Sequence, residues 1–72
     1  MSINQKFAFK IKKIRQELNI TQDELAILSN LNKSYIGKVE RSEINITLQI
    51  LEKLSIGLNK TPSELLDFSD IT

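Results

Sequence analysis

Polar and cationic side chains recur at helical spacing in one short stretch of the chain, Asn32 to Arg41. On a helix that turns about 100° per residue, one surface would carry Lys33, Ser34, Gly37, Lys38 and Arg41. Lysine can donate hydrogen bonds to guanine acceptors or to phosphates, and serine can meet either kind of partner. Ile36 and Val39 fall on another face. Such a helix would pack its back on a core while its cations face a DNA groove.

Gly37 is the unusual residue of this surface, because glycine inside a helix costs about 1 kcal/mol relative to alanine. A close approach of the backbone to DNA would explain it. Simple drift at an exposed site would explain it equally well, and the sequence leaves both explanations open.

The side chains that most enzymes rely on are missing from this chain. It has no cysteine and no histidine, so it lacks thiolate and imidazole metal ligands and the usual general base. The carboxylates are spread over helix starts and solvent-facing positions, and no pairing of a nucleophile with a base can be proposed. We therefore expect no enzyme activity, no catalytic residues, no metal and no cofactor.

Two short helices joined by a tight turn make up the segment from about residue 21 to residue 41. Thr21 is suited to cap the first helix, and Glu24, three residues later, completes a capping box. The predicted buried stripe of this helix is Leu25, Ala26 and Leu28. The turn follows at residues 30–32, and Asn32 caps the second helix.

A longer helix is predicted before this segment. Ser2 can cap it, with Gln5 in the position of a capping box, and the helix runs to about Asn19. Its apolar residues recur at intervals of four, three and four: Phe7, Ile11, Ile14 and Leu18.

Two more helices are predicted after the segment 21–41. Thr47 can cap the fourth helix, and Gly57 and Asn59 lie where it should end, since both tolerate a left-handed backbone. The predicted core residues of this helix are Leu48, Ile50, Leu51 and Leu54. Thr61 and Glu64 form a third capping box, with Pro62 at the first position of a helix that runs to about Asp67. No segment has the pattern of a β-strand, so we predict an all-α fold of five helices in a single domain, residues 1–72.

The net charge of the 72 residues is only +1, but its distribution is uneven. Residues 1–41 hold eight Lys/Arg and four Asp/Glu, a balance of +4, whereas residues 42–72 have a balance of −3. A basic half and an acidic half suit a protein with one face on phosphates, although chance fluctuation can also produce this difference. No apolar run is long enough to span a membrane and no signal peptide is visible, so we expect a cytoplasmic protein of bacterial or phage origin.

The stretches TQDELA, SNLNKSYIGKVER and NITLQILEKLSIGL together resemble the helix-turn-helix domain of the lambda-repressor/Cro-like (XRE-type) family of bacterial and phage regulators. The resemblance covers roughly Phe7 to Leu66. The short length and the join ER-x-x-x-N-I-T-L look most like the small controller proteins of restriction-modification systems. The resemblance implies the lambda-repressor-like fold and a transcription regulator that binds a specific double-stranded DNA operator.

The resemblance also implies which residues meet DNA. Gln22 would donate to a phosphate at the start of the first short helix, and Arg41, Asn45 and Thr47 match phosphate-touching positions. Lys33 and Ser34 are the expected base readers, because they begin the helix that enters the groove. Lys38 could reach a base or a phosphate, and Tyr35 could meet a phosphate or only pack on the core. The full expected set is Gln22, Asn32, Lys33, Ser34, Tyr35, Lys38, Arg41, Asn45 and Thr47.

Many controller-type relatives carry arginine where Lys33 and Ile44 stand, so their target sequence is not implied for this chain. Ile44 could instead meet a thymine methyl group or a partner subunit. In the family an arginine at the position of Arg15 pairs with the glutamate at the position of Glu40, which implies an ion pair here. Two independent surface charges are the alternative.

The C-terminal segment 61–72 is expected to form a homodimer, because the family dimerises through this end. The expected interface residues are Leu65, Leu66, Phe68 and Ile71. These side chains could also fold back onto the first helix. A two-fold dimer would read a near-palindrome with half-sites about 34–36 Å apart. RNA polymerase is a further expected partner if the protein activates transcription, with Glu43 or Glu52 as its contact. No membrane and no small-molecule effector is expected.

Two other functions stay open. A phage Cro-like repressor or an antitoxin would share the domain and its mechanism. A protein-interaction module that lost DNA binding belongs to a different class, and Lys33, Lys38 and Arg41 argue against it.

Overall fold

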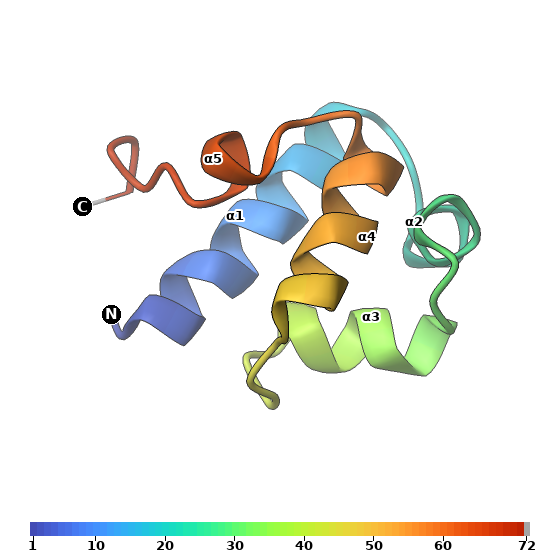
Figure 1. Ribbon diagram of the computed structural model, residues 1–72, viewed down its shortest axis with the longest axis horizontal. Coiled ribbons are helices and arrows are strands. Elements are labelled where there is room, and N and C mark those ends of the chain that lie inside the picture. The colour runs from blue at the N-terminus through green and yellow to red at the C-terminus, as the bar shows by residue number, and fades with distance from the viewer. Residues whose placement is uncertain (72) are drawn as a thin grey trace.

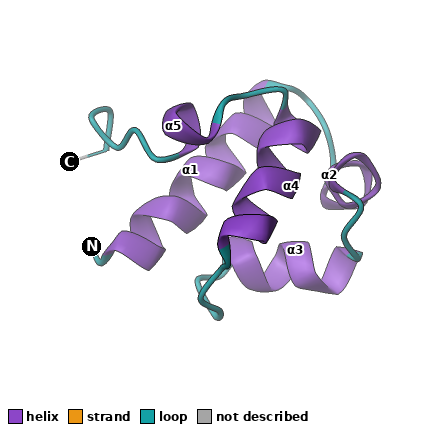
Figure 2. Ribbon diagram, in the orientation of Figure 1, coloured by secondary structure: helices purple, strands orange, loops and turns teal. Residues whose placement is uncertain are grey.

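Five α-helices follow one another along residues 1–71, the part of the chain that this computed structural model describes (Figure 1). They are α1 (Ile3–Glu17), α2 (Gln22–Ser29), α3 (Lys33–Glu40), α4 (Leu48–Leu58) and α5 (Pro62–Leu65). Figure 2 shows loops as the remainder and no strand in the described chain. The predicted all-α fold with a helix-turn-helix unit of α2 and α3 is confirmed. The last residue of the predicted dimerisation segment 61–72 lies outside the described residues.

A polar side chain starts every helix. These residues have extended backbone, and each accepts a hydrogen bond from the amide three positions later: Ser2, Thr21, Asn32, Thr47 and Thr61. Reciprocal capping boxes form at α1, α2 and α5, as predicted. A cap of this kind contributes about 1 kcal/mol, so the helix starts are set by local sequence.

The helix ends differ from expectation at three places. Helix α1 ends at Glu17, because Asn19 already has a left-handed φ of 58°. Helix α5 ends at Leu65 and therefore has only four residues. In α4 the left-handed residue is Asn59 (φ 54°), which leaves Gly57 inside the helix rather than at its end.

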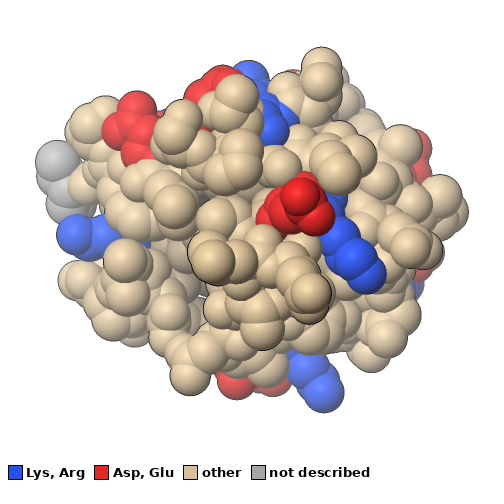
Figure 3. All heavy atoms as spheres, in the orientation of Figure 1, with Lys and Arg blue, Asp and Glu red and all other residues tan. Residues whose placement is uncertain are grey.

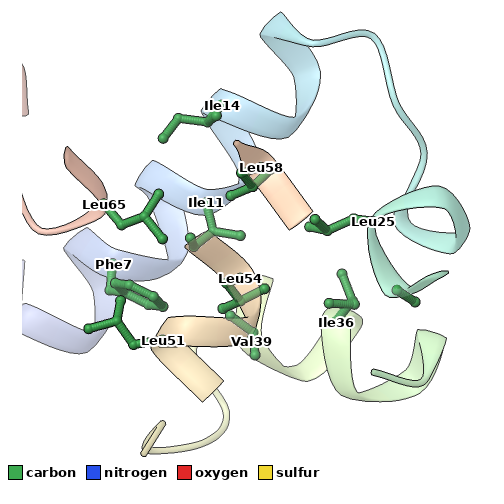
Figure 4. Close-up of a cluster of buried hydrophobic side chains, with 11 residues drawn as sticks. Phe7, Ile11, Ile14, Leu25, Ile36, Val39, Leu51, Leu54, Leu58 and Leu65 are labelled. Atoms are coloured by element: carbon green, nitrogen blue, oxygen red, sulfur yellow. The ribbon is translucent and has the colours of Figure 1, made fainter. Parts of the chain in front are cut away.

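The core draws on all five helices. Its largest fully buried side chains are Ile11, Leu25, Ile36, Leu54, Leu58 and Leu65. Figure 4 shows these side chains pointing into one shared interior, with Phe7, Ile14, Val39 and Leu51 around them. Burying each large aliphatic side chain contributes about 1.5–3 kcal/mol, which is how so short a chain can hold five helices together.

Three leucines that the sequence assigned to the core are exposed instead. Leu18 is 44% exposed, Leu28 54% and Leu48 83%. Leu18 is the C-cap residue of α1 and does not continue the buried stripe of that helix. In α2 the inward position goes to Ser29, and in α4 the stripe runs through Leu58 instead of starting at Leu48.

Helices α2 and α4 approach each other very closely at Ser29 and Gly57. A Cβ atom at Gly57 would stand 2.0 Å from the Ser29 hydroxyl oxygen and 3.1 Å from the Ser29 backbone nitrogen. The Ser29 hydroxyl is buried there and has no hydrogen-bond partner within residues 1–71. Two small residues therefore set the separation of these helices. Because α3 packs on α2, this crossing also positions α3.

Candidate nucleic-acid interface

Helix α3 lies along one edge of the molecule, with α5 at the opposite edge (Figure 1). Its inner residues Ile36 and Val39 are 0% and 2% exposed and belong to the core. The outward side carries four exposed polar residues: Lys33, Ser34, Lys38 and Arg41. The two-faced helix expected from the sequence is therefore present, and its polar side is exposed.

The start of α3 is held by Asn32. Its side-chain oxygen accepts hydrogen bonds from the Tyr35 amide (2.7 Å) and from the Ser34 hydroxyl (3.1 Å). Lys33 lies beside Asp23 of α2, with 3.5 Å between Nζ and the carboxylate, and both side chains are more than 60% exposed. Such a surface pair contributes at most about 1 kcal/mol, so Lys33 can leave it for a DNA group.

A polar cluster fixes the angle of α3 against α1 and α2. Arg15 donates to both carboxylate oxygens of Glu40, at 2.6 and 3.1 Å, and to the Ile20 carbonyl at 2.9 Å. The two charged side chains are only 12% and 3% exposed. The ion pair that the resemblance implied is therefore formed and largely removed from water, which favours specified geometry more than net stability.

Gln22 joins this cluster, because its side-chain amide donates to Glu40 at 3.0 Å. One of its two amide hydrogens is therefore engaged inside the protein. Its place at the first position of α2 is the one from which a phosphate contact was expected. No residue pattern indicates that this side chain also helps to orient α3.

Arg41 lies back over α3. Its Nε donates to Glu43 at 2.5 Å, and this hydrogen bond lowers the pKa of the Glu43 carboxyl. Gly37 is buried, and the nearest atoms to the place of a Cβ on Gly37 all belong to the Arg41 guanidinium. Drift at an exposed site therefore does not describe Gly37, because the Arg41 side chain covers it.

The loop between α3 and α4 brings the remaining predicted residues to the same end of α3. Asn45 and Thr47 are both exposed. The Asn45 side chain accepts a hydrogen bond from Asn4 at 2.6 Å, which ties the loop to α1, and Thr47 caps α4. Tyr35 is half-buried and packs against the core.

The predicted dimer residues do not share one environment. Leu65 is 0% exposed in the core of its own chain, so its assignment to an interface is wrong. Phe68 also packs partly on the core, and Ile71 is half-buried. Leu66 remains 45% exposed. The physical reason is that a four-residue helix carries one inward side chain, and Leu65 occupies that position.

An apolar groove of about 140 Å³ lies beside Leu66, and sequence analysis missed it. Its other apolar lining comes from the start of α1, from α3 and from the loop before α4: Ile3, Phe7, Val39, Ile44 and Ile46. The isolated isoleucines of a loop carry no periodic signal, so only the fold reveals that they meet. Of these residues Ile3 is 68% exposed.

The acidic tail modifies the charge separation expected from the sequence. Asp70 pairs with Lys10 at 3.0 Å and with Lys13 at 2.7 Å, so an acid of the second half lies on bases of the first. Hydrogen bonds from these lysines lower the Asp70 pKa to about 2. On the face seen in Figure 3 the basic and acidic side chains form small groups, and several of these adjoin a group of opposite charge. Within residues 1–71 no group of side chains suits a metal ion, and no helix is long and apolar enough to cross a membrane.

Comparison with known proteins gives consistent matches. The family model for a helix-turn-helix domain, HTH_3, matches residues 11–65. The control protein C.BamHI of Bacillus amyloliquefaciens is 38% identical over an alignment of 66 residues that covers 90% of this chain and 82% of that protein.

Two solved structures match over most of the fold. The restriction-modification controller protein C.AhdI of Aeromonas hydrophila superposes with a TM-score of 0.84 at 37% identity, over 86% of this chain and 94% of that one. C.Esp1396I bound to a 19 base pair DNA duplex has a TM-score of 0.84 at 38% identity, over 90% and 87% of the two chains.

Proposed function

The chain belongs to the helix-turn-helix family whose model spans residues 11–65, and on this premise we propose that it is a sequence-specific DNA-binding transcription regulator. The observation that carries the proposal is the two-faced helix α3. Its back is buried in the core, its orientation is tied by the Arg15–Glu40 pair, and its outer side carries exposed cations. The similar protein C.Esp1396I has been solved on a DNA duplex, which supports DNA binding by this chain.

The proposed contacts divide into two kinds. Lys33 and Ser34 face the base edges of the major groove, because they lie at the start of α3, and Lys38, on the same outer side in the last turn, reaches a base or a phosphate. Gln22, Asn45 and Thr47 flank α3 and meet phosphates, which set the register of the protein on the duplex. Asn32 holds the Ser34 hydroxyl in place, and Tyr35 supports the helix from its half-buried position.

The protein is proposed to act as a homodimer. Leu66 and the apolar groove beside it offer a surface that a second copy can cover, and Phe68 and Ile71 lie next to it in sequence. A two-fold dimer presents two α3 helices to half-sites about 34–36 Å apart, so the operator should be a near-palindrome.

The biological role we propose is that of the relatives, which are control proteins of restriction-modification systems. Such a regulator would act in the bacterial cytoplasm, where its operator DNA lies. Contact with RNA polymerase through Glu43 or Glu52, both exposed, would turn a bound dimer into an activator.

Selection of binding sites from random duplex DNA, followed by titration at two salt concentrations, tests the function. We expect a two-fold symmetric consensus and an affinity that falls steeply with salt, because bound cations release counterions. Lys33→Ala should relax the preference at one base pair, by about 1–3 kcal/mol, and Lys60→Ala, on the α4–α5 connection, serves as the control. Absence of any enriched sequence would remove the proposal.

A further inference from the structure

The guanidinium of Arg41 lies on the outer side of α3 rather than beyond its end. Arg41 follows the last residue of the helix, yet its Nη1 atom stands 2.9 Å from the place that a Cβ on Gly37 would take. The side chain therefore runs back along the helix by four residues, about 6 Å at 1.5 Å per residue. This brings a planar cation toward the start of α3, the end that enters a major groove.

Glycine at position 37 makes this placement possible. The three nearest atoms to a Cβ built at Gly37 are Nη1, Cζ and Nη2 of Arg41, at 2.9, 3.7 and 3.7 Å. A methyl group there would occupy the space that the guanidinium now fills. The helix thus has a notch in the middle of its outer side, and the notch holds one side chain.

Glu43 holds the guanidinium by one edge only. Its carboxylate accepts from Nε at 2.5 Å and from Nη2 at 3.5 Å. The Nη1 atom makes no hydrogen bond to any of residues 1–71. A guanidinium has five donors, and the edge formed by Nη1 and the second hydrogen of Nη2 has no partner among these residues, while the side chain as a whole is 60% exposed. That edge has the fork geometry that pairs with O6 and N7 of guanine.

Resting on the proposed function, we propose that Arg41 reads a guanine in each half-site, with Gly37 and Glu43 as its positioning residues. Arg41 was expected from the sequence only as a phosphate contact. A phosphate contact needs positive charge but no particular orientation, whereas this side chain is oriented by a carboxylate and a notch. A guanidinium discriminates between base pairs only when its two donor N–H groups are held in a fixed orientation.

The experiment compares Arg41→Lys and Arg41→Ala with the wild-type protein on its selected consensus and on duplexes with each G·C pair replaced. Arg41→Lys keeps the charge and removes the fork, so we expect a loss of about 5-fold to 150-fold in the preference for one G·C pair per half-site. Binding to unrelated DNA should change little. Lys60→Ala is the matched control for loss of a surface cation, and it should leave the preference intact.

Gly37→Ala supplies the second test. It should lower the preference at the same base pair, and it should have no further effect in the Arg41→Lys background. Its melting temperature should not fall, because the atom that it displaces is the end of a flexible side chain. Glu43→Gln should give a smaller loss at that base pair.

Two outcomes would overturn the inference. If Arg41→Ala loses the same affinity on every duplex and its binding depends less steeply on salt, Arg41 is a phosphate contact. No change on any duplex would place Arg41 outside the interface. In both cases a two-fold consensus for the wild-type protein would leave the proposed function standing, whereas no consensus would remove that function itself.

Discussion

The two glycines of this chain serve different packing needs. Gly57 lies where α2 and α4 cross, and a side chain there would meet both the side chain and the backbone nitrogen of Ser29. Gly37 lies on the outer side of α3, and the neighbour is only the tip of Arg41. Neither has a positive φ, so both are explained by space and not by backbone conformation.

Gly57→Ala should therefore destabilise the protein by about 1–3 kcal/mol, the usual cost of overpacking, although alanine favours helices. The new methyl group would clash with the Ser29 side chain and backbone nitrogen. Urea unfolding followed by circular dichroism measures the change. Gly37→Ala is the matched control, and it should be neutral or stabilising by up to about 1 kcal/mol.

A second substitution checks the partner in this crossing. Ser29→Gly should recover part of the stability of Gly57→Ala, because it removes the side chain that the methyl group meets. Full additivity of the two changes in unfolding free energy would show that the residues do not interact, and the packing account would fail.

The Arg15–Glu40 pair gives a further prediction at the residue scale. Glu40→Gln should cost about 3 kcal/mol, because it leaves Arg15 charged and mostly out of water. The same urea experiment measures it. Replacing both residues by apolar ones of similar size, Arg15→Met with Glu40→Leu, should restore much of the stability. A stable Glu40→Gln protein would mean that the pair is not coupled to folding.

At the scale of elements, helix starts were predictable and helix ends and faces were less so. Capping residues such as Thr21 act on the amide three positions away, so the signal is contained in a few neighbouring residues. Leu28 and Leu48 were misassigned because an apolar residue does not indicate which side of a helix will find a partner. Ser29 can face inward because Gly57 of α4 leaves space for it, and this contact is visible only in the tertiary structure.

The interface could be predicted in the same uneven way. The outer residues Lys33, Ser34 and Lys38 follow from the period of α3 and are exposed in the structure. Their contacts with DNA remain predictions. The placement of Arg41 over Gly37 could not be predicted, because it depends on a rotamer and on Glu43 in the following loop.

The segment after α5 carries the pH-dependent prediction. Asp70 clamps it to Lys10 and Lys13 of α1, and its pKa is lowered from 3.8 to about 2. A carboxyl with a lowered pKa in the folded protein stabilises it above the ordinary pKa, and this contribution is lost as the pH falls toward the folded value. The contribution is therefore complete above about pH 4 and gone near pH 2.

Asp70→Asn should lower the melting temperature slightly at neutral pH, and the difference from the wild type should close between about pH 4 and pH 2. Thermal melts across this range measure it. Ser69→Ala, next to it in sequence, is a suitable control for a change in the tail. A difference that persists at the acid end would point to a packing role for Asp70 in place of an ionic one.

At the scale of the whole molecule, folding and assembly meet at α5. Leu65 belongs to the core and Leu66 to the surface beside the apolar groove. Leu66→Asp should halve the sedimentation mass at micromolar concentration while the helical spectrum is kept. Ile56→Asp, at an isoleucine of α4 that is 69% exposed against 45% for Leu66, should leave the mass unchanged.

Leu65→Asp separates the two roles. It should unfold the protein, because a carboxylate would replace a side chain with no exposed surface. An unaltered dimer for Leu66→Asp would place the interface elsewhere. A folded monomer for Leu65→Asp would return Leu65 to the interface.

No side chain of α3 both packs in the core and faces outward. This separation determines how the DNA specificity of the protein can evolve. Ile36, Val39 and Glu40 hold the helix, whereas Lys33, Ser34 and Lys38 touch nothing in the core. New operators can therefore be acquired by substituting outward residues one at a time without crossing an unfolded intermediate. A library restricted to those positions is accordingly the economical route to retargeting this regulator.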